Sequence, residues 1–171
     1  MLTLSRLRSG FERLLEYIVI LLMISLAVEV ILGVTYRKLG MSLSWYDEVA
    51  SITLAWVTYY GAALAALKRA HIGFPGLVES LRPRLQVVLL LIGEFFVFAF
   101  FITLTWSGVQ VLGVLGTDTL VSLPQVPVSL TQSVIPIGGA LFVIAEALTF
   151  PEVLAKARAG LQLPDSRKGV S

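Results

Sequence analysis

Three acidic residues lie inside long apolar stretches of this 171-residue chain, and they are the residues best placed to do chemistry there. Glu94 lies about ten residues into one such stretch, which is ~15 Å along a helix. Because an ionisable group is costly in hydrocarbon, such a position is a functional candidate. Glu94 would either couple proton or ion movement or be a protonated or paired carboxyl that ties helices together. We favour the second interpretation, because no buried Arg, Lys or His is available to complete a relay.

Glu29 lies in the later part of the first apolar stretch, and Glu146 lies near the end of the last one. Glu29 shares a helical face with Arg37, whose long side chain can reach the membrane surface, so we expect a structural role for Glu29. Glu146 ends a face at three-to-four spacing that also carries Pro136 and Gly139, next to Gly138. Proline and adjacent glycines favour a kink or close helix packing there over a substrate site.

The remaining chemistry that the sequence permits is narrow. His71 is the only histidine and there is no cysteine, which argues against bis-histidine haem, histidine metal clusters and a Ser–His pair. No phosphate-binding loop, dinucleotide fingerprint or metal-ligand spacing is present. We therefore predict no catalytic, cofactor-binding or metal site, and no enzyme activity.

The amino-acid composition indicates that these apolar stretches lie in a lipid membrane. The chain is 57% hydrophobic and 14% charged, with a mean hydropathy of +0.88, whereas soluble domains average about 25% charged residues. The sequence predicts an all-α membrane protein, one domain over residues 1–171, with membrane lipids around it. Four segments are close to the ~20 residues that cross a bilayer. They are 14–36, 49–67, 85–115 and 128–150, followed by a polar tail, 151–171.

The basic residues predict one orientation for all four spans. Of the 13 Lys and Arg residues, all except Arg37 and Lys38 lie in the N-terminal arm, the loop between spans two and three, or the tail. Because Lys and Arg favour the cytoplasmic side, both termini should be cytoplasmic. A short surface segment, with an amphipathic turn at Leu77–Leu81, should join spans two and three. The net charge of +2 gives no sign of nucleic-acid binding.

The second span has one face of small residues at helical spacing. Small faces let helices approach closely in lipid, so we expect this face to contact other protein. The mid-span aromatic residues agree, because lipid-facing Trp and Tyr favour the membrane interfaces. The face comprises Glu48, Ser51, Ala55, Thr58, Ala62, Ala65 and Arg69, and the aromatic residues are Trp56, Tyr59 and Tyr60.

An ordered set of motifs in the same region resembles the small membrane subunit (the Q or DctQ-type subunit) of tripartite ATP-independent periplasmic transporters. The set is Trp45-x-Asp47-Glu48, Trp56-x-x-x-Tyr60-Gly61-Ala62-Ala63-x-Ala65, Arg69-x-His71-Ile72, and Pro136-Ile137-Gly138. Asp47 stands where the family often has the first of two glutamates, and Gly73-Phe74 depart from its usual Val and acid. The resemblance covers about residues 10–150.

The resemblance implies an importer in the bacterial inner membrane. A periplasmic binding protein captures an organic acid, such as a dicarboxylate or sialic acid, and a large membrane subunit moves it, driven by sodium. The small subunit would brace that large subunit. Residues Trp45 to His71 named above would then form the packing interface, and Arg37, Lys38 and Asp118 would face the binding protein.

Two other functional classes remain open at this point. One is a self-sufficient small transporter or channel that works as a homo-oligomer with Glu94 along its path. The other is a membrane anchor for an enzyme complex, against which the lack of intramembrane histidine argues.

Overall fold

The computed structural model describes residues 2–69 and 83–162, and in these ranges every long element is a helix. Four of the described helices are long and apolar enough to cross a membrane, which confirms the predicted fold class. The bounds are α1 Leu2–Lys38, α2 Tyr46–Leu67, α4 Pro83–Leu115, a short α5 Val128–Gln132 and α6 Val134–Gln162. The expected surface turn Leu77–Leu81 and His71 lie outside the described residues.

Two helices extend beyond the expected spans. Helix α1 begins at Leu2 rather than at residue 14. Helix α6 continues through Pro151 to Gln162, beyond the expected end of the span at residue 150. A proline removes one backbone hydrogen bond but leaves the rest of the ladder intact, so a long apolar helix can contain it.

The fourth span is broken near its start. Ser133 separates α5 from α6, three residues before Pro136. A proline ring clashes with the carbonyl of the residue four positions earlier, which here is Gln132, the last residue of α5. The kink expected from Pro136 is therefore confirmed, and its position has a steric cause.

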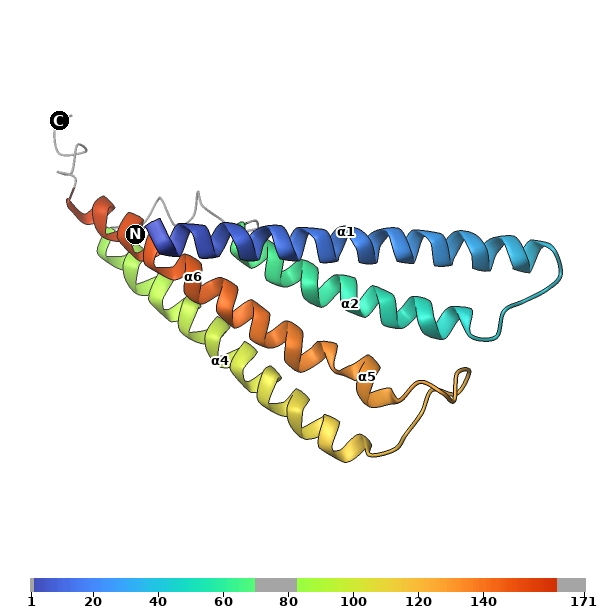
Figure 1. The fold of residues 1–171 in the computed structure, drawn as a ribbon. Helices are drawn as coiled ribbons and strands as arrows, with labels where there is room; N and C mark the ends of the chain where they lie inside the picture. Colours follow the sequence, from blue (N-terminus) through green and yellow to red (C-terminus); the bar gives the residue numbers. More distant parts are fainter. Residues whose placement is uncertain (1, 70–82, 163–171) are drawn as a thin grey trace.

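The helices form an open layer in the order α1, α2, α6, α4 (Figure 1). Helix α2 packs against α1 and α6, and α6 packs against α4, so α1 and α4 are the edges. Many large apolar side chains on the edge helices are exposed, among them Phe95, Phe100 and Trp106 on α4. Exposed apolar surface on this scale requires lipid or other protein to cover it.

Glycines allow close contact at each seam of the layer. A Cβ atom at Gly33 would meet the Tyr46 ring between α1 and α2. A Cβ atom at Gly138 would lie 2.7 Å from Cβ of Tyr59 on α2. At Gly139, on the other side of α6, it would lie 2.5 Å from Oγ1 of Thr105 on α4. The close packing expected at the adjacent glycines is confirmed, and the two residues serve opposite seams.

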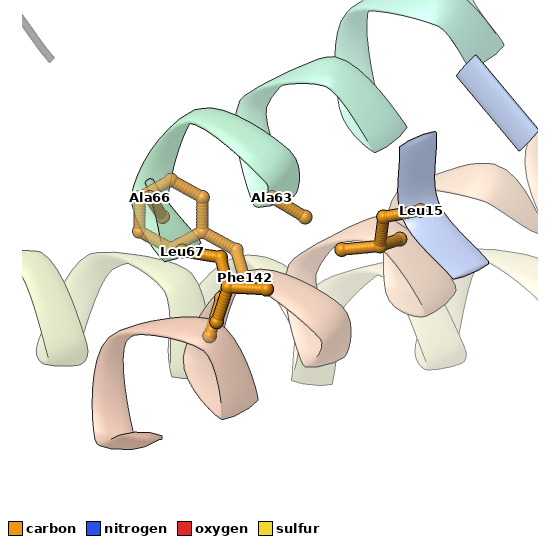
Figure 2. Close-up of a cluster of buried hydrophobic side chains, with 6 residues drawn as sticks. Leu15, Ala63, Ala66, Leu67 and Phe142 are labelled. Carbon is orange, nitrogen blue, oxygen red and sulfur yellow. The ribbon is translucent and has the colours of Figure 1, made fainter. Parts of the chain in front are cut away.

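The buried core is small and lies towards the end of the layer where α1 begins and α2 ends. Figure 2 shows its side chains. Leu15 of α1, Leu67 of α2 and Phe142 of α6 meet there. Ala63, Ala66 and Ala145 complete the cluster. Most of the remaining apolar surface is available for contacts outside the chain.

Substitutions of glycine test these seams. Gly138→Ala should lower the stability of the purified chain by about 1–3 kcal/mol, because the added methyl group overlaps Cβ of Tyr59, which cannot rotate away. Gly113→Ala is the control, since nothing lies within 4 Å of its added Cβ. The thermal unfolding midpoint in detergent checks both variants, and equal midpoints would contradict the assigned α2–α6 seam.

Candidate functional site

The end of α2 has an unusual backbone. The helix ends at Leu67, Lys68 caps it, and Arg69 adopts a φ of 52°, in the left-handed region. Glycine usually occupies this position after a helix, because other residues pay about 1–2 kcal/mol for the conformation. The arginine thus occupies a position where its backbone is strained, which suggests that its side chain has a role there.

The Arg69 side chain joins three helices. Its Nη1 atom lies 2.9 Å from Oε1 of Glu94 on α4 and 2.9 Å from Oε1 of Glu146 on α6. Both acidic side chains are largely buried, at 11% and 7% exposed. The sequence offers no buried Arg, Lys or His for a relay, but the partly exposed Arg69 leaves the end of α2 and its side chain reaches Glu94. The geometry supports the interpretation of Glu94 as a paired carboxyl that ties helices together.

A cavity of about 650 Å³ adjoins this cluster. Ala62 and Arg69 of α2 line one side, α4 lines the other, and Phe142 and Glu146 of α6 lie between them. The remaining lining residues are Leu89, Leu90, Gly93, Glu94, Val97 and Phe101. We call this space the α2–α4 groove. It is apolar apart from the charged cluster, and Oε2 of Glu94 is buried without a hydrogen-bond partner.

Three further ion pairs lie at the same end of the layer: two join Lys68 to α1, and one joins α1 to α6. Lys68 hydrogen bonds to Glu16 and lies 3.8 Å from Glu12, both on α1. The hydrogen bond to Glu16 raises the pKa of Lys68. Arg8 of α1 donates to the carbonyl of Leu67 (3.0 Å) and pairs with Glu152 of α6 (2.6 Å). Three consecutive residues at the end of α2, Leu67 to Arg69, thus bind all three other long helices.

Glu29 does not pair with Arg37, although both lie on α1. Its Oε1 atom accepts hydrogen bonds from Ser25 of the same helix and Thr53 of α2, each 3.2 Å long. Arg37 instead lies 3.7 Å from Asp47, in an exposed pair beside the Tyr46 ring. The structural role expected for Glu29 is supported, but the partner is a hydroxyl group of the neighbouring helix.

The small face expected on α2 is only partly covered by this chain. The most buried residues of α2 are Ala63, Ala66 and Leu67. Ala63 and Leu67 lie on a different face, whereas Ala66, four residues after Ala62, is at the edge of the predicted face. On the predicted face Ser51 and Thr58 are exposed, while Ala55, Ala62 and Ala65 are half-buried. The hydroxyl groups of Ser51 and Thr58 donate to carbonyls four residues earlier in their own helix. The face therefore has no unpaired hydroxyl group and remains open to lipid or protein.

The aromatic residues of α2 contact this chain itself. Trp56 donates its Nε1–H to the carbonyl of Thr131, 3.1 Å away, which fixes α5 against α2. The rings of Trp56 and Tyr60 are 6.3 Å apart. Gly61 has open space where a side chain would be, and Trp45 is half-buried as the residue that caps α2. Trp56 and Tyr60 thus pack within the chain.

At the opposite end, Glu48 makes a contact that the sequence pattern did not reveal. It accepts hydrogen bonds from the N–H groups of Val121 (3.3 Å) and Ser122 (2.9 Å), and from the Ser122 hydroxyl group. The three residues predicted to face a binding protein also lie at this end. Lys38 and Asp118 are exposed, as is Arg37 beside Asp47. No periodic signal links Glu48 to a residue 74 positions later.

Comparison with known families decides the identity. A family model described as "Tripartite ATP-independent periplasmic transporters, DctQ component" matches residues 26–155. The chain belongs to this DctQ family. It is accordingly a multi-pass inner-membrane component of a tripartite transporter. The match confirms the resemblance to this family that the sequence motifs indicated. Among curated proteins, none matches this DctQ chain.

Two substitutions of Arg69 distinguish the effect of its backbone conformation on stability from the effect of its side chain. Arg69→Ala should destabilise the chain by about 1–3 kcal/mol, because it leaves two largely buried carboxylates without their base. Arg69→Gly should destabilise it by about 1 kcal/mol less, since glycine adopts the left-handed conformation without strain. Unfolding midpoints in detergent give this order.

Arg37→Ala is the matched control for these variants. Its pair with Asp47 is exposed, so the stability change should stay within about 0.5 kcal/mol. Combining Arg69→Ala with Glu94→Gln and Glu146→Gln should destabilise the chain by less than the sum of the separate changes. Additive losses would show that the three side chains do not act as one cluster.

Proposed function

We propose that this DctQ chain is the non-catalytic scaffold subunit of a sodium-driven importer of an organic acid, of the dicarboxylate or sialic-acid type. A large membrane subunit would carry out the movement, and a periplasmic binding protein would deliver the substrate. Both termini would face the cytoplasm. The loops 39–45 and 116–127 would then face the periplasm, as the distribution of Lys and Arg predicts.

This proposal rests on the partners of the three intramembrane acidic residues. Glu94 and Glu146 share Arg69, and Glu29 accepts from Thr53 of the neighbouring helix. Each of these acids thus joins helices of the same chain. A transport path needs charged groups that exchange partners as the substrate passes, whereas fixed pairs between helices suit a brace.

The open layer supports a partner on the face that carries the α2–α4 groove. Helices α2 and α4 lie on either side of α6, and the groove between them is wide enough to receive side chains from another helix. The small face of α2 borders this groove at Ala62 and Arg69. Without a hydrophobic drive in lipid, close packing of small faces is what holds membrane helices together. We therefore assign this face to the large subunit.

A single observation favours the alternative of a self-sufficient homo-oligomeric transporter. Oε2 of Glu94 is buried beside a cavity and has no hydrogen-bond partner, as a group awaiting a cation would. The alternative requires flux through liposomes that contain this chain alone, and loss of that flux in Glu94→Gln. The scaffold account expects no flux in either case.

Filling the groove tests the seam with the large subunit. Ala62→Leu should reduce the amount of large subunit that co-purifies from mild detergent by more than about threefold, since the added atoms occupy space the partner needs. The stability of the isolated chain should hardly change, because the cavity accommodates the larger side chain. The co-purified ratio of the two subunits, measured by mass spectrometry, gives the result.

Ala27→Leu is the control, because Ala27 is exposed on α1, away from the groove. It makes the same change in volume and should leave co-purification unchanged. If both variants retain the large subunit equally, the groove does not belong to the interface. If the native chain brings down no large membrane protein, the scaffold function itself is wrong.

A further inference from the structure

The loop between α4 and α5, residues 116–127, forms a small hairpin. The N–H of Leu120 donates to the carbonyl of Val126 (3.0 Å), and the N–H of Val128 donates to that of Asp118 (2.8 Å). Thr119 and Pro127 pair as an isolated bridge at its base. The two hydrogen bonds are those that define this bridge, and so short a pairing is only marginally stable in water. The hairpin therefore needs support from outside itself.

Glu48 supplies that support from the first turn of α2. Its two carboxylate oxygens together accept three hydrogen bonds from Val121 and Ser122. Hydrogen bonds to a carboxylate are about twice as strong as neutral ones. The position at the start of a helix further favours a negative charge. Leu120, the preceding residue, is buried at 8% exposure. The tip of the hairpin is thus fixed both by a buried side chain and by a charged clamp.

The same clamp leaves one side chain projecting outward. Val121 is 94% exposed, the most exposed large apolar residue in the described part of the chain. Its N–H is bound to Glu48, so the valine side chain is presented from a fixed backbone. An apolar group on a pre-ordered backbone binds a partner more tightly than one on a mobile loop, because less freedom is lost on association.

We infer that Glu48 is a positioning residue that holds the 116–127 hairpin, with Val121 outward, in the form that docks the substrate-loaded periplasmic binding protein. This inference rests on the proposed function, which places the hairpin on the periplasmic side. The partner it fits is a soluble protein that presents a small apolar depression. Exposed Arg37, Lys38 and Asp118 at the same end of the chain would add charged contacts around it.

The test uses the complete transporter in liposomes, with uptake measured against the concentration of loaded binding protein. Glu48→Gln should raise the concentration that gives half-maximal uptake by about five- to tenfold, because the hairpin must be reordered on docking. The maximal rate should stay within about twofold. Ser122→Ala removes the hydroxyl donor and keeps the backbone N–H, so a smaller rise in the same direction is expected.

Glu12→Gln is the control, because it neutralises an acid at the far end of the layer, where Glu12 lies 3.8 Å from Lys68. It should leave the half-maximal concentration unchanged. Hydrogen exchange at the amides of Val121 and Ser122 gives a second measurement, independent of transport. In Glu48→Gln both amides should exchange at least about tenfold faster, since they lose their acceptor.

The outcomes separate the inference from the proposed function. Faster exchange with an unchanged half-maximal concentration would overturn the docking role. A lower maximal rate with an unchanged half-maximal concentration would reduce Glu48 to a general structural role and overturn the inference. A native complex that shows no uptake dependent on the binding protein would instead overturn the proposed function.

Discussion

The basic end of α2 is the constraint on which the arrangement of the four long helices depends. Leu67, Lys68 and Arg69 bind α1, α4 and α6 through one backbone carbonyl and two cationic side chains. Successive residues around a helix end point in different directions, so adjacent cations can serve helices on opposite sides. The left-handed backbone of Arg69 lets it reach the far side of the layer. The strain of that conformation is offset by two ion pairs in a largely buried setting.

This constraint explains how an open layer can have a defined shape with so small a core. A closed bundle holds its helices by packing on all sides, but here α1 and α4 each have one helix neighbour across most of their length. Glycine seams set the spacing between neighbours, and the ion pairs hold the edge helices where the buried cluster ends. Glu48 and Trp56 do the corresponding work at the other end. The open faces remain free for lipid and for the other transporter components.

Much of the fold follows from the sequence alone, because it depends on local patterns. The lengths of the apolar segments and the positions of the charged residues predicted four spans. Pro136 predicted the kink, because a proline distorts the helix that contains it. The pair of Gly138 and Gly139 indicated close packing, yet the sequence could not say that they serve two different seams. Nor could it pair Arg69 with Glu94 or Glu48 with Ser122. Those contacts depend on the lateral order of the helices and on how each loop folds back, which periodicity within one helix does not encode.

The small face of α2 illustrates the same limit. Three-to-four spacing places the small residues on one face. Whether their partners lie inside or outside the chain depends on Tyr59, Ala63 and Leu67, which pack inward. Once that inward face is known, Ala62 lines the open groove, and Thr58, one turn earlier on the same face, is exposed. The step from fold to function is to assign this surface of α2 to a partner subunit.

Cysteine crosslinking tests that step most directly, because the chain contains no cysteine of its own. Single cysteines at Thr58 and, as a reference, at exposed Met23 on α1 would each carry a short photoactivatable group in native membranes. The account predicts efficient crosslinking from position 58 to a much larger membrane protein, and mainly lipid adducts from position 23. Lipid adducts alone from position 58, or crosslinks only to a second copy of this chain, would contradict it.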